Sequence, residues 1–390
     1  MLDYRQGCEK MKILGLVVEY NPFHNGHILH IQKSIDLIKP DYVIAVMSSS
    51  FVQRGEPAII DKWTRSKIAI QYGIDLIIEL PFVYSVQSAD YFAKGAIDLL
   101  YHAGATDIVF GSECGDIEVF KDIAYAINDN EELYNSYVKE YMNQGLRYPD
   151  ACNQALSILL NKEVRTPNDL LGLCYVKEII NHHYPIIPHC IERTNDYHSE
   201  ELLEISSATS IRKALLDNND VSHSLPCVDY YQNIHLNTLE DFYPYLKYKV
   251  LSSSLEELRN IHLIDEGLEN RIKQQISLCH TMEEFTDSLS SKRYTKVRIQ
   301  RMIIHLLMNN TKKDINDAIN VNYLRILALS DKGREYLKIL KKTSDYTIVS
   351  NFSSYTHPAL TIEAKATSLI SLINKDIKEE YKYYPYIKSK

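Results

Sequence analysis

Two histidines near the start of the chain have the spacing of a phosphate-binding turn. His24-Asn25-Gly26-His27 follows a break in regular structure at Asn21-Pro22. A helix start leaves backbone N–H groups unpaired and carries partial positive charge, which suits a phosphate group. Gly26 lets the backbone approach a ligand closely because it has no Cβ. Imidazole N–H donors on this turn would hold phosphate oxygens as their charge rises during a displacement. The alternative is that the two histidines only cap and pack a surface turn.

A second stretch rich in hydroxyl groups lies at residues 206–212, read as SSATSIR. Small hydroxyl side chains at a helix start offer O–H and N–H donors to phosphates, and Arg212 adds a planar charged fork. A purely structural N-cap is the alternative. Because the chain already holds the histidine turn, phosphate binding is the favoured interpretation.

Buried strands must position these residues. Short, almost continuous apolar runs predict parallel strands at residues 13–18, 41–47, 74–80, 107–110 and 185–191. Apolar residues with helical spacing follow the first run at 28–38. The same spacing occurs from about residue 62, at 88–101 and after Asn168. Strands that alternate with helices predict an α/β fold with a parallel sheet, whose ligands lie outside the carboxyl ends of the strands. Gly111 follows the fourth run and therefore falls on the same edge as the histidine turn.

Charge is unevenly distributed along the 390 residues, although the whole chain has a net charge of −8. Residues 1–240 hold 19 basic and 33 acidic side chains, for a net charge of −14, whereas residues 241–390 hold 24 and 18, for +6. Only the second half has the sign that an RNA backbone requires. The length predicts two domains.

Cysteine usage and the lack of membrane-spanning or secretory segments predict the cellular location. The seven cysteines are scattered without a CxxC pair, which indicates thiols in a reducing cytosol and not a zinc site or a disulfide framework. The sequence contains no apolar run of membrane-spanning length and no secretory h-region. We therefore expect a cytoplasmic protein that does not contact the membrane. Residues 1–10 are polar and patternless, and we interpret them as an extension.

The string VEYNPFHNGH at residues 18–27 is more specific than the histidine spacing alone. The turn resembles the HxGH signature of the HIGH-motif nucleotidyltransferase superfamily, and residues 206–212 resemble its ISSTxIR motif. The longer string resembles the bacterial tRNA(Met) cytidine acetate ligases, and the likeness runs over most of the chain from Met11. The resemblance implies a Rossmann-like nucleotidyltransferase domain and a two-step reaction. Acetate and ATP would form acetyl-adenylate, and the acetyl group would then pass to the wobble cytidine of elongator tRNA(Met), giving N4-acetylcytidine.

The resemblance also implies the site residues. His24 and His27 would be catalytic. The residues that would bind ATP are Val17, Val18, Glu19, Tyr20, Asn21, Pro22, Phe23, His24, Asn25, Gly26, His27, Ile28, Leu29, His30, Gly111, Asn168, Arg193, Ser210 and Arg212. Mg²⁺ is expected as the counterion of ATP, with no metal ligand from the protein. Ser49-Ser50 stands where these relatives usually have Gly-Asn.

Cations that could contact tRNA fall in two groups. Five lie within ten residues of a predicted helix, Lys292, Arg293, Lys296, Arg298 and Arg301. Three more, Arg54, Lys62 and Arg65, follow the second strand and would reach either a triphosphate or the RNA. The alternative for both groups is a solvated cationic face.

We therefore predict an N-terminal extension at 1–10, a nucleotidyltransferase-like catalytic domain at 11–235 and a helical tRNA-binding domain at 236–390. Three other functions stay open from the residues. The first is an adenylyltransferase that makes a small-molecule cofactor, and the second is a citrate-lyase-ligase-like acetate ligase. The third is an RNA-binding protein with a decayed nucleotide site, which two intact signatures disfavour.

Overall fold

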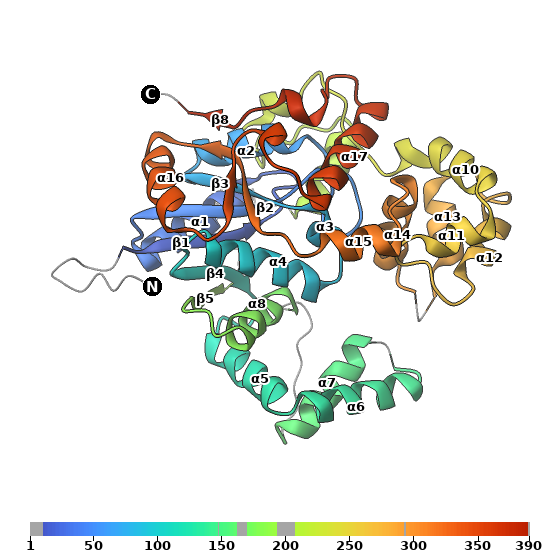
Figure 1. Cartoon of the computed structure of the whole chain (residues 1–390), viewed down its shortest axis with the longest axis horizontal. Helices are drawn as coiled ribbons and strands as arrows, with labels where there is room; N and C mark the ends of the chain where they lie inside the picture. Colours follow the sequence, from blue (N-terminus) through green and yellow to red (C-terminus); the bar gives the residue numbers. More distant parts are fainter. Residues whose placement is uncertain (1–10, 147, 162–169, 193–206, 292–293, 389–390) are drawn as a thin grey trace.

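The computed structural model describes residues 11–146, 148–161, 170–192, 207–291 and 294–388. Within these ranges eight strands form a sheet in the order β5-β4-β1-β2-β3-β6-β7, with β8 also paired to β6 (Figure 1). The strands are β1 Ile13–Val18, β2 Tyr42–Ser48, β3 Leu76–Leu80, β4 Asp107–Ser112, β5 Ile187–Glu192, β6 Tyr323–Leu329, β7 Thr347–Val349 and β8 Tyr386–Ile387. Every pairing is parallel except that of β6 with β3. The predicted α/β class and the five predicted strands are confirmed.

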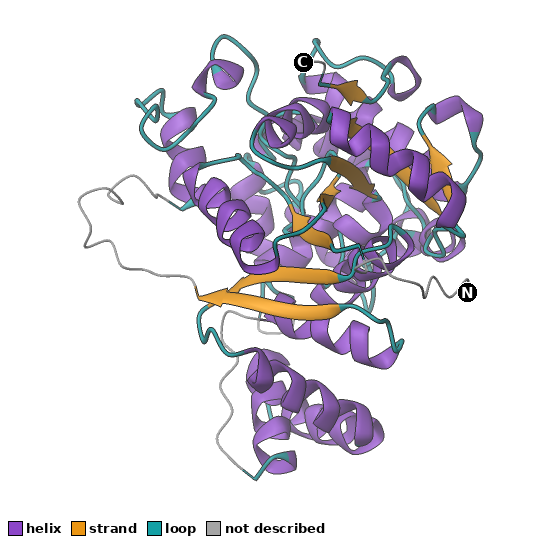
Figure 2. Ribbon diagram, turned by 90° about the vertical axis from the view of Figure 1, so that its left-hand side faces the viewer, coloured by secondary structure: helices purple, strands orange, loops and turns teal. Residues whose placement is uncertain are grey.

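The central strands are apolar throughout because helices cover both faces of the sheet. In β1, Leu14 and Leu16 face one apolar cluster while Ile13 faces another. The first cluster includes side chains of α1 Asn25–Ile38, α2 Lys62–Gln71 and α9 Ala208–Leu216. The second includes those of α3 Phe82–Ser85, α4 Ala89–His102, α8 Leu170–Asn181, α16 Asp331–Thr343 and α17 Pro358–Ile373. Figure 2 shows helices on both sides of the strands.

Two groups of helices extend from this body. The charged side chains of residues 116–161 are predominantly acidic, and we call this segment the acidic insertion. Its described part forms α5 Ile117–Asp129, α6 Glu131–Asn143 and α7 Tyr148–Leu159, which project together in Figure 1. The second group is α10 Tyr243–Ser252, α11 Leu255–Asn260, α12 Leu268–Gln275, α13 Met282–Leu289, α14 Lys296–Leu307 and α15 Lys312–Ala318. The 3₁₀ turns in the described ranges are η2 Val228–Tyr231, η3 Glu240–Phe242, η4 Phe352–Ser354 and η5 Glu380–Lys382. Among the described helices, we find no candidate for a membrane span.

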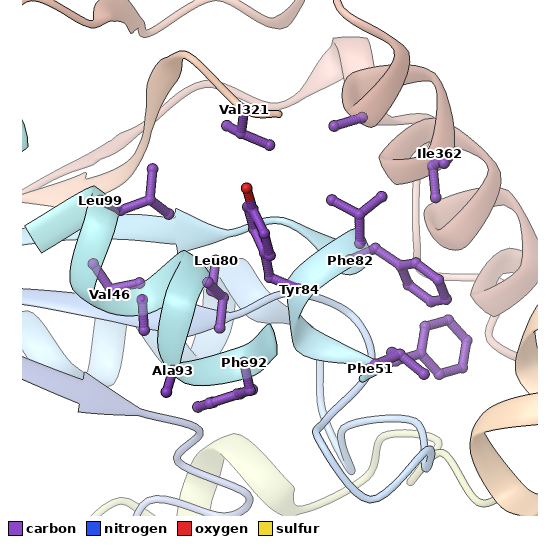
Figure 3. Close-up of a cluster of buried hydrophobic side chains, with 14 of the residues drawn as sticks. Val46, Phe51, Leu80, Phe82, Tyr84, Phe92, Ala93, Leu99, Val321 and Ile362 are labelled. Carbon is purple, nitrogen blue, oxygen red and sulfur yellow. The ribbon is translucent and has the colours of Figure 1, made fainter. Parts of the chain in front are cut away.

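The predicted boundary at 235/236 needs correction, because the chain returns to the sheet after α15. Strand β6 pairs antiparallel with β3, and α17 packs beside α3. Figure 3 shows Tyr84 of α3 pointing toward Val321, while Phe82 and Phe51 pack beneath Ile362 of α17. The stretch of 236–390 that consists only of helices is thus α10–α15, and β6, β7 and β8 belong to the same sheet as the N-terminal strands. Sequence periodicity missed β6 because its Arg325 interrupts an apolar run.

A buried cluster of ionised side chains joins this returning segment to the sheet. Lys62 of α2 lies 2.8 Å from Glu380 of η5 and 3.2 Å from Glu363 of α17, and it also contacts Glu79 of β3. Arg325 of β6 contacts Glu79 at 2.9 Å and also Glu380. Burial disfavours the charged form of Lys62, but these carboxylates outweigh that effect and raise its pKa. Burial raises the pKa of Glu363 to about 7.

Replacing Lys62 with methionine removes one of the two cations and leaves three buried carboxylates. Breaking a buried ion pair from one side costs about 3–5 kcal/mol because the remaining charge stays desolvated. We expect Lys62→Met to lower the free energy of unfolding by about that amount in urea denaturation. Lys313→Met is the control, since its side chain is 82% exposed and should change stability by under about 0.5 kcal/mol. Equal stability of the two variants would contradict a supporting role for the cluster.

Candidate functional site

The histidine turn is built as the cap of helix α1. Strand β1 ends at Val18, and α1 begins at Asn25 with His24 as its N-cap. The backbone N–H of Gly26 donates to Nδ1 of His24 at 3.1 Å, and the N–H of His24 donates to Nδ1 of His27 at 3.2 Å. The two rings lie 3.8 Å apart between centroids. Because Nδ1 accepts in both rings, each neutral imidazole carries its proton on Nε2.

Aromatic side chains pack against His27, and burial sets the protonation state of His24. Tyr20 and Phe23 lie 4.9 Å and 5.7 Å from His27 between ring centroids. Burial lowers the pKa of His24 to about 4, so this ring is neutral at physiological pH. The turn therefore presents a neutral N–H donor at the start of a helix, where the macrodipole also favours an anion.

The two signature motifs meet at Asn21. Arg212 of α9 donates from Nη1 to the backbone oxygen of Asn21 at 2.8 Å. Ser207 caps α9 by accepting from the N–H of Ser210 at 3.1 Å, and the two hydroxyls lie 2.9 Å apart. The Asn21 side chain accepts from the N–H of Ile59, and the Asn21–Pro22 bond is cis. Residues that are 191 positions apart in the sequence thus assemble one corner, which carries the Arg212 guanidinium.

Gly111 and the histidine turn lie at the carboxyl edge of the sheet. Strand β4 pairs with β1 on one side and β5 on the other, all parallel, so Gly111 lies at the edge where the histidine turn begins. Asn25 donates from its side chain to the backbone oxygen of His223 at 2.9 Å. Asn168 and Arg193 fall outside the described residues. This edge is where open parallel sheets bind their ligands.

The comparisons with known proteins agree with this geometry. Residues 11–383 match the family model described as HIGH Nucleotidyl Transferase. The chain belongs to this family. It is 39% identical to the tRNA(Met) cytidine acetate ligase of Bacillus subtilis, over 96% of each chain. It is also 39% identical to that of Geobacillus sp., over 97% of this chain and 100% of the relative. The crystal structure of Thermotoga maritima TmcAL bound with alpha-thio ATP superposes with a TM-score of 0.86 at 30% identity, covering 97% of this chain and 99% of that one.

Two of the cations predicted to contact tRNA are instead inside this HIGH nucleotidyl transferase. Lys62 and Arg65 are both fully buried. Lys62 belongs to the ion cluster described above, and Arg65 donates to the backbone oxygens of Glu19 and Ser49. The expectation that they reach RNA is therefore wrong. They sit three residues apart on the face of α2 that packs on the sheet. Because cations are not expected on the buried face of a helix, the sequence pattern of α2 did not indicate that these two are buried.

The cations of α14 divide between two environments. Lys296 lies 2.7 Å from Asp287 and 3.7 Å from Glu283, and Arg298 lies 3.8 Å from Asp265. Both side chains are partly exposed, as is Arg54. Arg301 instead donates from Nε to the backbone oxygen of Gln53 at 2.7 Å. Lys292 and Arg293 lie outside the described residues.

A loop between β2 and α2 carries residues that motif reasoning missed. Gln53 donates from its N–H to Glu19 at 2.7 Å, and Glu56 lies 3.9 Å from Arg212. Burial raises the pKa of the Glu19 carboxyl, while the bond from Gln53 and the nearby guanidinium of Arg65 oppose that rise. The sequence Gly55-Glu56-Pro57 is typical of a turn, but it does not indicate these contacts. The partners of Gln53 and Glu56 lie on distant segments, so sequence spacing could not identify them.

The described ranges contain no group of three or more His, Cys, Asp or Glu that could hold a metal ion.

Ser49 and Ser50 are buried at the end of β2, where Ser49 accepts from Arg65 and Ser50 accepts from the N–H of Ala58. Both contacts use the backbone oxygen. These two contacts do not depend on the identity of the side chains at 49 and 50.

The burial of His24 and its role as the N-cap of α1 predict how its ring titrates in the ligand-free protein. We expect its ring to protonate with a midpoint near pH 4 and to hold its proton on Nε2 from pH 6 to 8, because burial disfavours the imidazolium. Long-range ¹H–¹⁵N spectra of the histidine rings measure both properties, and His24→Gln assigns the signal. A midpoint above pH 6, or a proton on Nδ1, would contradict this assignment of the cap.

Proposed function

We propose that the protein is an ATP-dependent acetate ligase that acetylates the wobble cytidine of elongator tRNA(Met). The observation that carries this proposal is the 39% identity, over nearly the full length, to relatives named tRNA(Met) cytidine acetate ligase. The corner formed by the histidine turn and Arg212 is consistent with nucleotide chemistry. The proposal places the enzyme in the cytoplasm, with its tRNA substrate.

In the first step an acetate oxygen attacks the α-phosphorus of ATP. The new O–P bond forms acetyl-adenylate, and the bond to the β-phosphate oxygen breaks to release pyrophosphate. Nε2–H of His24 and of His27 would donate to phosphate oxygens, and Arg212 and the start of α9 would add charge and further donors. A fixed array of donors needs no rearrangement at the moment of reaction, which is why preorganised caps suit this role.

Mg²⁺ would accompany ATP and neutralise part of its phosphate charge. With nucleotide substrates this ion is commonly held by phosphate oxygens and water, so the proposal requires no dedicated cage of protein ligands. The residues predicted to bind ATP at 17–30, with Gly111, Ser210, Arg212, Asn168 and Arg193, remain our proposal for the nucleotide site.

In the second step the 4-amino group of cytidine attacks the acetyl carbonyl of acetyl-adenylate. A C–N bond forms, AMP leaves with the electrons of the C–O bond, and the amine loses a proton. The tRNA would lie along the exposed cations of α14 and Arg54. Those of α14 are Lys296 and Arg298, and Lys292 and Arg293, which precede this helix in the sequence, stay part of the proposal. The positive charge of the second half of the chain supports this path.

The first step predicts exchange of labelled pyrophosphate into ATP that depends on acetate and not on tRNA. His27→Ala should lower the exchange by about 100-fold or more, since it removes a donor to the developing charge, and should leave tRNA affinity largely intact. Measuring exchange with and without acetate tests acyl-adenylate formation. Transfer of labelled acetate to added tRNA separates the proposed function from the citrate-lyase-ligase-like alternative, which also activates acetate. Exchange without acetate would favour a small-molecule adenylyltransferase, and no exchange under any condition would exclude acyl-adenylate chemistry.

The tRNA path predicts a change in salt dependence. Replacing Lys292, Lys296 and Arg298 with alanine should weaken tRNA binding and flatten the log–log salt slope by about 0.7–0.9 for each phosphate that the variant no longer neutralises. Unrelated tRNAs should weaken equally, because phosphate contacts position the RNA and carry no sequence information. Filter binding across salt concentrations measures this, with Lys139→Ala of the acidic insertion as the control. An unchanged slope in the folded triple variant would show that α14 is only a solvated face.

A further inference from the structure

Helix α14 is held against the loop that supports the histidine turn. Gly55 lies at the centre of the contact, with φ at +75°. A Cβ at this position would lie 2.4 Å from the backbone nitrogen of Arg301 and 2.7 Å from its Cα. The backbone of α14 therefore packs directly on the loop, closer than any residue with a side chain would allow. The contact requires glycine for both space and conformation.

One path of hydrogen bonds runs from α14 to the residue after β1. The Nε of Arg301 donates to the backbone oxygen of Gln53 at 2.7 Å, and the N–H of Gln53 donates to Glu19 at 2.7 Å. The Gln53 side chain also donates to the backbone oxygen of Gln87 at 3.0 Å. Burial lowers the pKa of Arg301 to about 10, so it stays charged at neutral pH. Both the N–H and the carbonyl oxygen of Gln53 are thus fixed.

A second path of contacts connects α14 to the histidine turn through Glu56 and Arg212. Gln300 donates to Glu56 at 3.2 Å, Glu56 lies 3.9 Å from Arg212, and Arg212 donates to the backbone oxygen of Asn21 at 2.8 Å. The two paths leave neighbouring residues of α14. They end at Glu19 and Asn21, which stand just before the capping histidines.

We propose that Arg301 and Gln300 are positioning residues for adenylate formation, which fix Glu19, Asn21 and hence the histidine turn without touching ATP. This inference rests on the proposed function and assigns to α14 a role in the step that needs no tRNA. Arg301 is then part of the ATP-site support, and its loss impairs chemistry before any RNA is bound. A tRNA contact alone would leave that step intact.

The test compares Arg301→Met, Arg301→Lys and Gln300→Met with Lys313→Met, an exposed cation on the next helix. Acetate-dependent pyrophosphate exchange is measured without tRNA, together with thermal melting. We expect Arg301→Met to lower kcat by about 10- to 100-fold, the effect of a small misplacement of reacting groups, with a smaller change in KM for ATP. Arg301→Lys keeps a charged donor and should restore most of the rate. Lys313→Met should behave as the unmodified protein.

Hydrogen exchange at residues 19–27 gives a readout that does not depend on the reaction. Arg301→Met and Gln300→Met should lose at least about tenfold in amide protection there, and Arg301→Lys should regain it, with melting temperatures unchanged. Unchanged protection, or a loss that spreads over the whole chain, overturns the inference. If the unmodified protein shows no acetate-dependent exchange, the proposed function fails, while the protection data still decide whether α14 positions the turn.

Discussion

The fold depends on the burial of charge at Lys62. Burying an ammonium group is costly unless opposite charges surround it, and here those charges come from β3, α17 and η5. Arg325 of β6 shares two of the same carboxylates, so the cluster cannot form until the end of the chain has returned to the sheet. The cluster consequently fixes the C-terminal end of the helices α10–α15. They leave the body near η3 and re-enter it at β6, which holds α14 beside the loop at Gly55.

The sequence predicted the parts of the molecule that are encoded locally. Apolar runs identified β1–β5, and proline, glycine and histidine at residues 22–27 identified a turn between a strand and a helix. The edge shared by this turn and Gly111 followed from the rule that parallel strands end on the same side. Each of these inferences needs only a window of residues and a general property of parallel sheets.

The failures concern residues whose environment is set by distant segments. Lys62 and Arg65 are cations near a helix start, and nothing within α2 says that carboxylates and carbonyls from elsewhere will enclose them. Strand β6 was missed because a charged residue interrupts its apolar run, and Arg325 is tolerated there only because Glu79 and Glu380 are adjacent. Arg301 resembles Arg298 in sequence, but the close approach permitted by Gly55 gives it a different partner. Asn168 and Arg193 lie outside the described residues, so their roles rest on the resemblance alone.

The positions of Arg298 and Arg301 on one helix have a consequence for how RNA and nucleotide sites are related. Three residues of α-helix rise about 4.5 Å, so the two guanidinium groups leave the helix within one turn of each other. Arg298 stacks on Tyr294 and faces Asp265, where a phosphate would compete with a single carboxylate. Arg301 instead donates to the backbone oxygen of Gln53. A phosphate held at Arg298 would therefore lie about one helical turn from the loop that supports the histidine turn.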